Sequence, residues 1–138
     1  DFLGLPFAGA LEISTTKTGR GTHVLHTFFQ MEDGSFLAFF DDPNTPFDFK
    51  AQRDFDLHIA LEVEHQQLEP MLERGREAGI ESRGISDHGF IDSIYFRDPN
   101  GYVIELTARR PGQEDNVGDE GDPHEILKKW TRAKVATQ

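Results

Sequence analysis

This 138-residue chain has no cysteine and no long apolar run, and its 14 basic residues are outnumbered by 25 acidic ones. Without cysteine there can be no disulfide and no thiolate metal ligand, which is compatible with the reducing cytoplasm that we expect for this protein. The longest all-apolar run, Phe36 to Phe40, is far too short to span a membrane, and the N-terminus lacks the pattern of a signal peptide. The net charge of −11 argues against nucleic acid or an anionic membrane as a partner.

The residues that are present suffice for one globular domain with a real core, since 36% of them are hydrophobic and 12 are Phe. Part of the acidity is local, because residues 113–122 hold five acidic side chains and no basic one. We interpret 111–121 as an acidic, solvated linker and 122–138 as a C-terminal helix with Asp122 as its N-cap. The docking face of that helix would consist of Ile126, Leu127 and Trp130.

Hydrophobic patterns before the linker predict mostly strands. Alternating or apolar runs predict strands at Leu11 to Thr15, His23 to Met31, Ser35 to Asp42 and Asp56 to Val63. A helix is predicted at Leu68 to Ala78, followed by a short strand near Ile80 and by two strands within Ser93 to Ala108.

The order of these elements contains a repeat. A shift of 67 positions places Gly34 on Gly101 and Leu37 on Ile104, each within a similar hairpin. The pattern predicts an α+β fold of paired βαβββ modules, 1–50 and 51–110, which form one curved, mainly antiparallel sheet. The first module lacks its first strand and most of its helix, of which Asp1 to Phe7 would be the end.

Glu105 is the residue that most needs an explanation, because it lies between Ile104 and Leu106 in a β-rich run. The turn at Asp98 to Gly101 predicts that Tyr95 pairs with Glu105 across the hairpin. His58 lies on the polar face of its own strand, and an imidazole that meets a carboxylate there suits a divalent metal. An ordinary hydrogen bond between His58 and Glu105 is the structural alternative.

Gly84, His88, Ile94-Tyr95, Asp98-Pro99, Gly101 and Glu105 follow one another in the order of a known signature. This order resembles the extradiol dioxygenase signature of the vicinal-oxygen-chelate superfamily, which also contains glyoxalases and bleomycin resistance proteins. The resemblance covers about residues 1 to 110. The gap between the first Gly and the His is one residue longer here than in the usual form.

The resemblance implies that His58 and Glu105 are metal ligands and that the third ligand lies upstream of Asp1. It also implies that His88 and Tyr95 lie beside the metal, where an imidazole and a phenol can stabilise developing oxyanion charge. A loop histidine and a packing aromatic are the structural alternatives for these two residues.

Two positions depart from the related enzymes. Ser35 stands where the dioxygenases have an acid–base His, and Ala38 stands where glyoxalase-like relatives have a further carboxylate ligand. His26 is our candidate substitute for the acid–base His, and a partly exposed strand histidine is its alternative. The face that His26 shares is aromatic and predicts either a pocket for an aromatic substrate or simple core packing. Its aromatic residues are Phe28, Phe36 and Phe40.

The leading hypothesis is therefore a divalent-metal-dependent enzyme, extradiol-dioxygenase-like, that acts on a small aromatic or vicinal-oxygen substrate. Fe(II) or Mn(II) is the expected ion, with Zn(II) or Ni(II) as alternatives. A glyoxalase- or epimerase-like proton-transfer enzyme and a metal-free ligand-binding protein of the bleomycin resistance type remain the rival interpretations. A homodimer is expected through the unpaired sheet edge of the first module.

Overall fold

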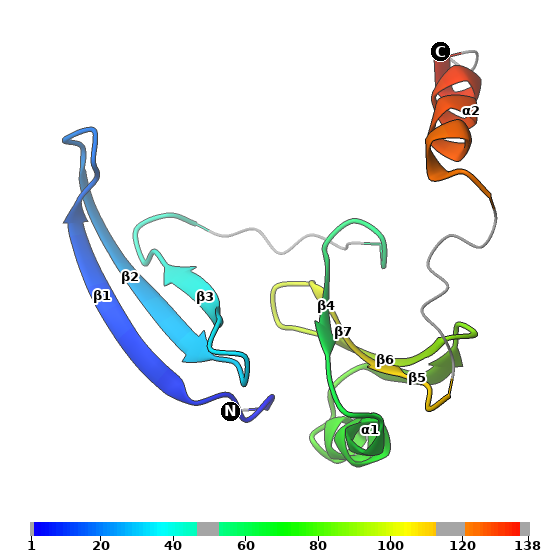
Figure 1. The fold of residues 1–138 in the computed structure, drawn as a ribbon. Coiled ribbons are helices and arrows are strands. Elements are labelled where there is room, and N and C mark those ends of the chain that lie inside the picture. Colours follow the sequence, from blue (N-terminus) through cyan, green and yellow to red (C-terminus); the bar gives the residue numbers. More distant parts are fainter. Residues whose placement is uncertain (1, 47–52, 113–120, 136–138) are drawn as a thin grey trace. The chain divides into compact units, whose positions relative to one another are not determined.

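The computed structural model describes residues 2–46, 53–112 and 121–135. Its internal contacts divide the chain into two compact units, Asp1–Lys50 and Ala51–Gln138. Each unit has its own β-sheet (Figure 1).

Unit 1 is a three-stranded antiparallel sheet in the order β1-β2-β3. Its strands are β1 (Phe7–Thr15), β2 (Gly21–Gln30) and β3 (Phe36–Asp41). The expectation that Asp1 to Phe7 ends a helix is wrong for the described residues 2–7. None of these residues is helical, and the end of the stretch already belongs to the sheet. The backbone N–H of Gln30 donates to Pro6 O at 3.0 Å, and Phe7 pairs with Phe29 of β2.

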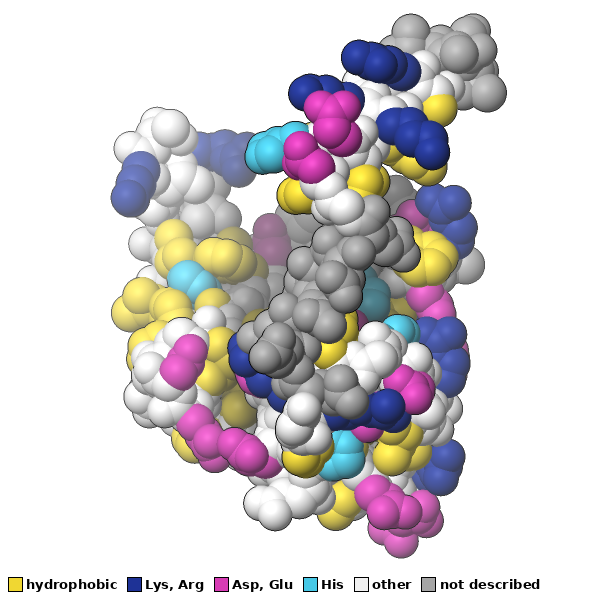
Figure 2. Space-filling view, turned by 45° about the vertical axis from the view of Figure 1, so that its right-hand side comes forward, with side chains coloured by type: hydrophobic (Ala, Val, Ile, Leu, Met, Phe, Trp, Pro, Cys, Tyr) yellow, Lys and Arg dark blue, Asp and Glu magenta, His cyan; other side chains and the backbone are white. Residues whose placement is uncertain are grey.

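Both faces of the unit 1 sheet carry aromatic side chains. His26 is stacked on Phe40 and tilted against Phe28, with ring centroids 4.0 and 4.1 Å apart. On the opposite face, Phe29 lies against Phe7 and Phe39, at 5.6 and 5.8 Å. Hydrophobic side chains therefore reach the surface over this unit (Figure 2).

Unit 2 contains the complete βαβββ module, and the α+β fold class is confirmed. Its sheet has the order β4-β7-β6-β5, in which β4 runs parallel to β7 and the other pairs are antiparallel. The elements are β4 (His58–Glu62), the 3₁₀ turn η1 (His65–Gln67), α1 (Leu68–Glu77), β5 (Ser82–Asp87), β6 (Ile91–Arg97) and β7 (Val103–Arg109).

Helix α1 covers one face of this sheet and builds the core of unit 2 (Figure 1). Leu68 and Leu72, one helical turn apart, are buried on the side of α1 that faces the sheet. The sheet contributes Ile94, Phe96, Leu106 and Ala108, all at most 4% exposed. Because side chains alternate along a strand, the neighbouring positions of β6 and β7 project from the opposite face, where polar residues gather.

The two hairpins repeat each other in backbone detail. The N–H of Met31 donates to Ser35 O at 2.8 Å, and the N–H of Asp98 donates to Tyr102 O at 2.9 Å. Gly34 and Gly101 both have positive φ, 84° and 91°, which only glycine adopts without strain. Ala38 pairs with Phe28 as Glu105 pairs with Tyr95, so the predicted equivalence of Ala38 and Glu105 is confirmed.

Helix α2 (Pro123–Val135) begins after Asp122, whose Oδ1 accepts the N–H of His124 at 2.9 Å. The large hydrophobic side chains of α2 that are exposed are Ile126, Leu127 and Trp130. Among the described helices, none combines the length and the apolar character that crossing a membrane requires.

We predict that Gly75→Ala destabilises unit 2 although alanine is the better helix former. A Cβ at Gly75 would lie 2.7 Å from Ser82 Oγ and would overlap the buried Phe96 ring. Overpacking of this kind costs about 1–3 kcal/mol, against a helix-propensity gain of about 1 kcal/mol. Urea unfolding measures the difference, and the double variant with Phe96→Leu should recover part of the loss. A Gly75→Ala protein as stable as the parent would contradict the packing described here.

Candidate metal and acid–base site

His58 and Glu105 meet on the face of the unit 2 sheet opposite α1. His58 begins β4, and Glu105 lies in the middle of the adjacent strand β7, paired with Ala60. His58 Nε2 lies 2.7 Å from Glu105 Oε2, and only 13% of the Glu105 side chain is exposed. The imidazole is therefore the group that holds this half-buried carboxylate.

The second ring nitrogen of His58 fixes the orientation of the imidazole. Nδ1 lies 3.0 Å from the backbone carbonyl oxygen of Asp54. Because a carbonyl can only accept, Nδ1 carries a hydrogen, and Nε2 is the nitrogen aimed at Glu105. Nε2 and Oε2 are also the two atoms that would hold a metal ion with nitrogen and oxygen ligands.

Tyr95 and His88 lie beside this pair. Tyr95 is opposite Glu105 in the β6–β7 ladder, and its ring lies edge-on to that of His58, with centroids 6.0 Å apart. Tyr95 Oη is 2.7 Å from His88 Nε2. Burial, and then the negative charge of Glu105, raise the pKa of Tyr95. The phenol therefore keeps its proton and remains a hydrogen-bond donor at neutral pH.

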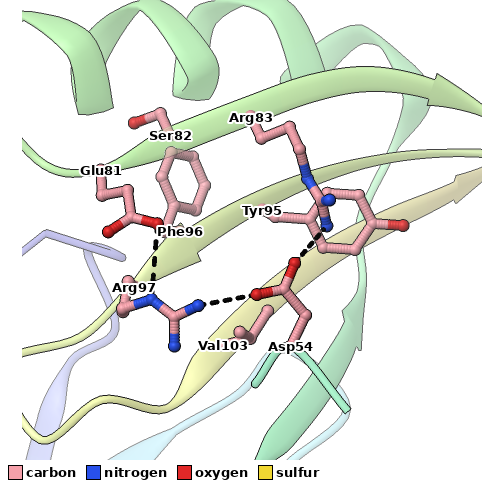
Figure 3. A pocket seen from close by; sticks show the side chains of 8 residues that line it. All are labelled: Asp54, Glu81, Ser82, Arg83, Tyr95, Phe96, Arg97 and Val103. Carbon is pink, nitrogen blue, oxygen red and sulfur yellow. Dashed lines mark hydrogen bonds and ion pairs between the residues drawn. The ribbon is translucent and has the colours of Figure 1, made fainter. Parts of the chain in front are cut away.

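A cavity of about 250 Å³ adjoins the site and is lined by charged side chains (Figure 3). The Arg83 guanidinium lies over the Tyr95 ring, 4.5 Å from its centroid. Asp54 forms ion pairs with Arg83 at 3.0 Å and with Arg97 at 2.7 Å. Glu81, Ser82, Phe96 and Val103 complete the lining. Asp54 and Arg83 were not among the predicted site residues. The register of β5 against β6, in which Arg83 pairs with Tyr95, is the signal that would have placed Arg83 on this face.

The loop that carries His88 is tied down at its base. Asp87 and Asp92 oppose each other across the β5–β6 hairpin, and Arg110 Nη2 lies 2.8 Å from a carboxylate oxygen of each. His65 Nε2 is 2.9 Å from the other oxygen of Asp92. The hydrogen bond from Arg110 lowers the pKa of the nearly buried Asp92. This cluster compensates two facing carboxylates that would otherwise repel each other.

The structure thus brings His58 to Glu105 and His88 to Tyr95, while His26 lies in β2 of unit 1 against Phe28 and Phe40. No group of three or more His, Asp or Glu suited to a metal is found in residues 2–46, 53–112 and 121–135. His58 and Glu105 nevertheless fit two positions around a divalent ion, because both are preferred ligand types and the ring is already oriented.

Comparison with known proteins found no matching family model. The metallothiol transferase FosB of Shouchella clausii (strain KSM-K16) is 36% identical over 78 residues, in an alignment that covers 53% of this chain and 51% of that protein. The chain thus aligns with about half the length of this curated relative.

Solved structures are similar over more of the chain. A glyoxalase family protein from Bacillus cereus has a TM-score of 0.58 at 21% identity, covering 78% of this chain and 80% of that one. The fosfomycin resistance protein FosX of Listeria monocytogenes has a TM-score of 0.53 at 19% identity, covering 80% and 77%. The chain has the fold of these structures, which is the fold that the resemblance to the vicinal-oxygen-chelate superfamily implied.

We predict that Tyr95 ionises above the ordinary tyrosine value of about 10 in the metal-free protein. The chain has two tyrosines, so Tyr102→Phe leaves Tyr95 as the only one in an absorbance titration. Adding Glu105→Gln should lower the pKa of Tyr95, because a nearby negative charge is removed. Glu62→Gln, which removes an exposed carboxylate paired with Arg109, is the matched control and should leave it unchanged. An equal response to both substitutions would contradict the assigned cause.

Proposed function

We propose that this chain carries the metal site of a divalent-metal-dependent enzyme that acts on a small molecule bound through two adjacent oxygens. The observation that carries the proposal is the contact of His58 Nε2 with Glu105 Oε2, together with the Asp54 carbonyl that fixes the His58 ring. A histidine tied in this way is the usual arrangement of a metal ligand.

The ligand types favour Mn(II) or Fe(II), with Zn(II) or Ni(II) as alternatives. When bound, such an ion supplies Lewis-acid polarisation of the substrate's oxygens. Two protein ligands leave coordination positions for further donors and for the substrate. The name metallothiol transferase, carried by the relative from Shouchella clausii, also supports a metal-dependent reaction.

His88 and Tyr95 are the proposed acid–base pair. The Tyr95 phenol keeps its proton because of burial and the adjacent carboxylate, and its O–H can donate to His88 or to a substrate oxygen. A donor that is already in place stabilises negative charge as it develops on that oxygen. His88 then holds or returns the proton through Nε2, the nitrogen nearest the phenol. The acid–base role of His26 stays a prediction from the sequence.

Two reaction classes are supported by separate observations. Similarity to FosB over 78 residues favours transfer of a thiol to a small molecule. The run from Gly84 to Glu105, which resembles the extradiol dioxygenase signature, favours oxygen insertion into an aromatic substrate instead. We place thiol transfer first, because Ser35 occupies the position where the dioxygenases have their acid–base His.

The ligand assignment is tested with Mn(II) alone. Glu105→Gln keeps the size of the side chain but removes its charge, and should weaken Mn(II) binding by about tenfold or more, measured by calorimetry. Glu62→Gln, on the neighbouring strand β4, is the control and should bind Mn(II) like the parent. Unchanged Mn(II) affinity in Glu105→Gln would contradict the assignment.

The reaction class is tested by following two co-substrates in parallel. The Mn(II)- and Fe(II)-loaded protein is incubated with fosfomycin and a panel of thiols, and separately with catechols in an oxygen electrode. Loss of free thiol that depends on fosfomycin and on the metal supports thiol transfer, whereas oxygen uptake with a catechol supports the dioxygenase. Tyr95→Phe should lower kcat by about tenfold to a hundredfold in either case. Turnover without metal would overturn the proposal.

A further inference from the structure

The five residues before β4, Arg53 to Leu57, form a strap across the site face of the unit 2 sheet. Strands β4 and β5 are the two edges of this sheet. The strap ends at the β4 edge, where Leu57 O accepts the N–H of Val103 at 2.8 Å. Asp54, three residues earlier, nevertheless pairs with Arg83 of β5 at the opposite edge (Figure 3). One side chain therefore fastens the strap to the far side of the sheet.

Resting on the function proposed above, we propose that Asp54 is a positioning residue that aligns both His58 and Tyr95. Its backbone carbonyl accepts the Nδ1 hydrogen of His58 at 3.0 Å. Its carboxylate pairs with Arg83, whose guanidinium lies over the Tyr95 ring. A single residue thus contacts the metal-ligating histidine directly and reaches the phenol through one cation.

Arg97 makes this attachment rigid. Its Nη2 donates to Asp54 Oδ1 at 2.7 Å and its Nη1 donates to Gly101 O at 3.0 Å, within the β6–β7 turn. Its Nε also lies 3.4 Å from Glu81, and only 23% of the Arg97 side chain is exposed. Two nitrogens of the one guanidinium therefore hold Asp54 against the turn. Charge-assisted hydrogen bonds from the planar guanidinium are directional.

The position of the Asp54 carbonyl consequently depends on the Asp54 carboxylate. If the carboxylate lost its charge, the strap would keep its backbone connection to β7 at Leu57 but lose its two ion pairs with β5 and β6. The acceptor for His58 Nδ1 would then move, and Nε2 would no longer be the one nitrogen aimed at Glu105. Such hydrogen bonds to the non-ligating nitrogen typically change metal affinity by about 10–100-fold.

The strap offers a matched control at Asp56. Asp56 carries the same charge two residues away, but its carboxylate pairs with Arg53 within the strap itself. Asp54→Asn and Asp56→Asn therefore remove the same charge from the same segment. Only the first removes contacts with β5 and β6.

Two measurements decide the proposal. In the metal-free protein, ¹⁵N-resolved NMR should detect a protected Nδ1–H on His58 in the parent and in Asp56→Asn, and its loss in Asp54→Asn. Calorimetry with Mn(II) alone should give an affinity about tenfold lower for Asp54→Asn and a parental affinity for Asp56→Asn. An Asp54→Asn protein that is less stable but keeps both the Nδ1–H signal and the Mn(II) affinity would overturn the proposal.

The variant Arg97→Lys and the NMR signal of the metal-free protein can still test the proposal if Asp54→Asn does not fold or the parent does not bind Mn(II). If Asp54→Asn does not fold, Arg97→Lys keeps one charge beside Asp54 but removes the fork, and should reduce the Nδ1–H protection partially. Unchanged protection in Arg97→Lys would then overturn the proposal. If the parent does not bind Mn(II), the proposed function fails, while the His58 signal of the metal-free protein still decides the role of Asp54.

Discussion

The parallel pairing of β4 with β7 is the constraint on which the site depends. It brings together His58 and Glu105, which are 47 positions apart in the chain. Parallel neighbours need a crossover, and helix α1 belongs to the connection that leads from β4 back to the sheet. The same register therefore sets both the core under α1 and the polar face opposite. A slip of one residue would turn His58 toward the helix and end both arrangements.

The site costs folding free energy because the Glu105 carboxylate is held largely away from water. Burying an unpaired charge would be strongly unfavourable, and Glu105 avoids this through His58 on one side and Tyr95 on the other. His58 is in turn oriented by the Asp54 carbonyl, and Asp54 by two arginines. Each polar group on this face thus has a partner that fixes its direction, as a preorganised site requires.

The β6–β7 hairpin and the proximity of His58 to Glu105 could be predicted from local sequence patterns. The turn at Asp98 to Gly101 determines the register, and strand alternation places His58 on the polar face. Asp54 could not be predicted, because its contacts with Arg83 and Arg97 join segments with no shared pattern. The stretch before Phe7 was mistaken for a helix end, because glycine and proline mark helix ends and other irregular segments alike.

The two hairpins of the repeat share a backbone conformation but carry different side chains. Both hairpins share one turn and one register, yet the shift that takes Gly101 to Gly34 takes Glu105 to Ala38 and Tyr95 to Phe28. The unit 1 hairpin accordingly packs aromatic rings where the unit 2 hairpin holds a charge and a phenol. The turn glycines, Gly34 and Gly101, therefore determine the shape of the two hairpins but not their chemistry. The proposed metal site therefore depends on a few side chains that differ between two hairpins with the same turn and register.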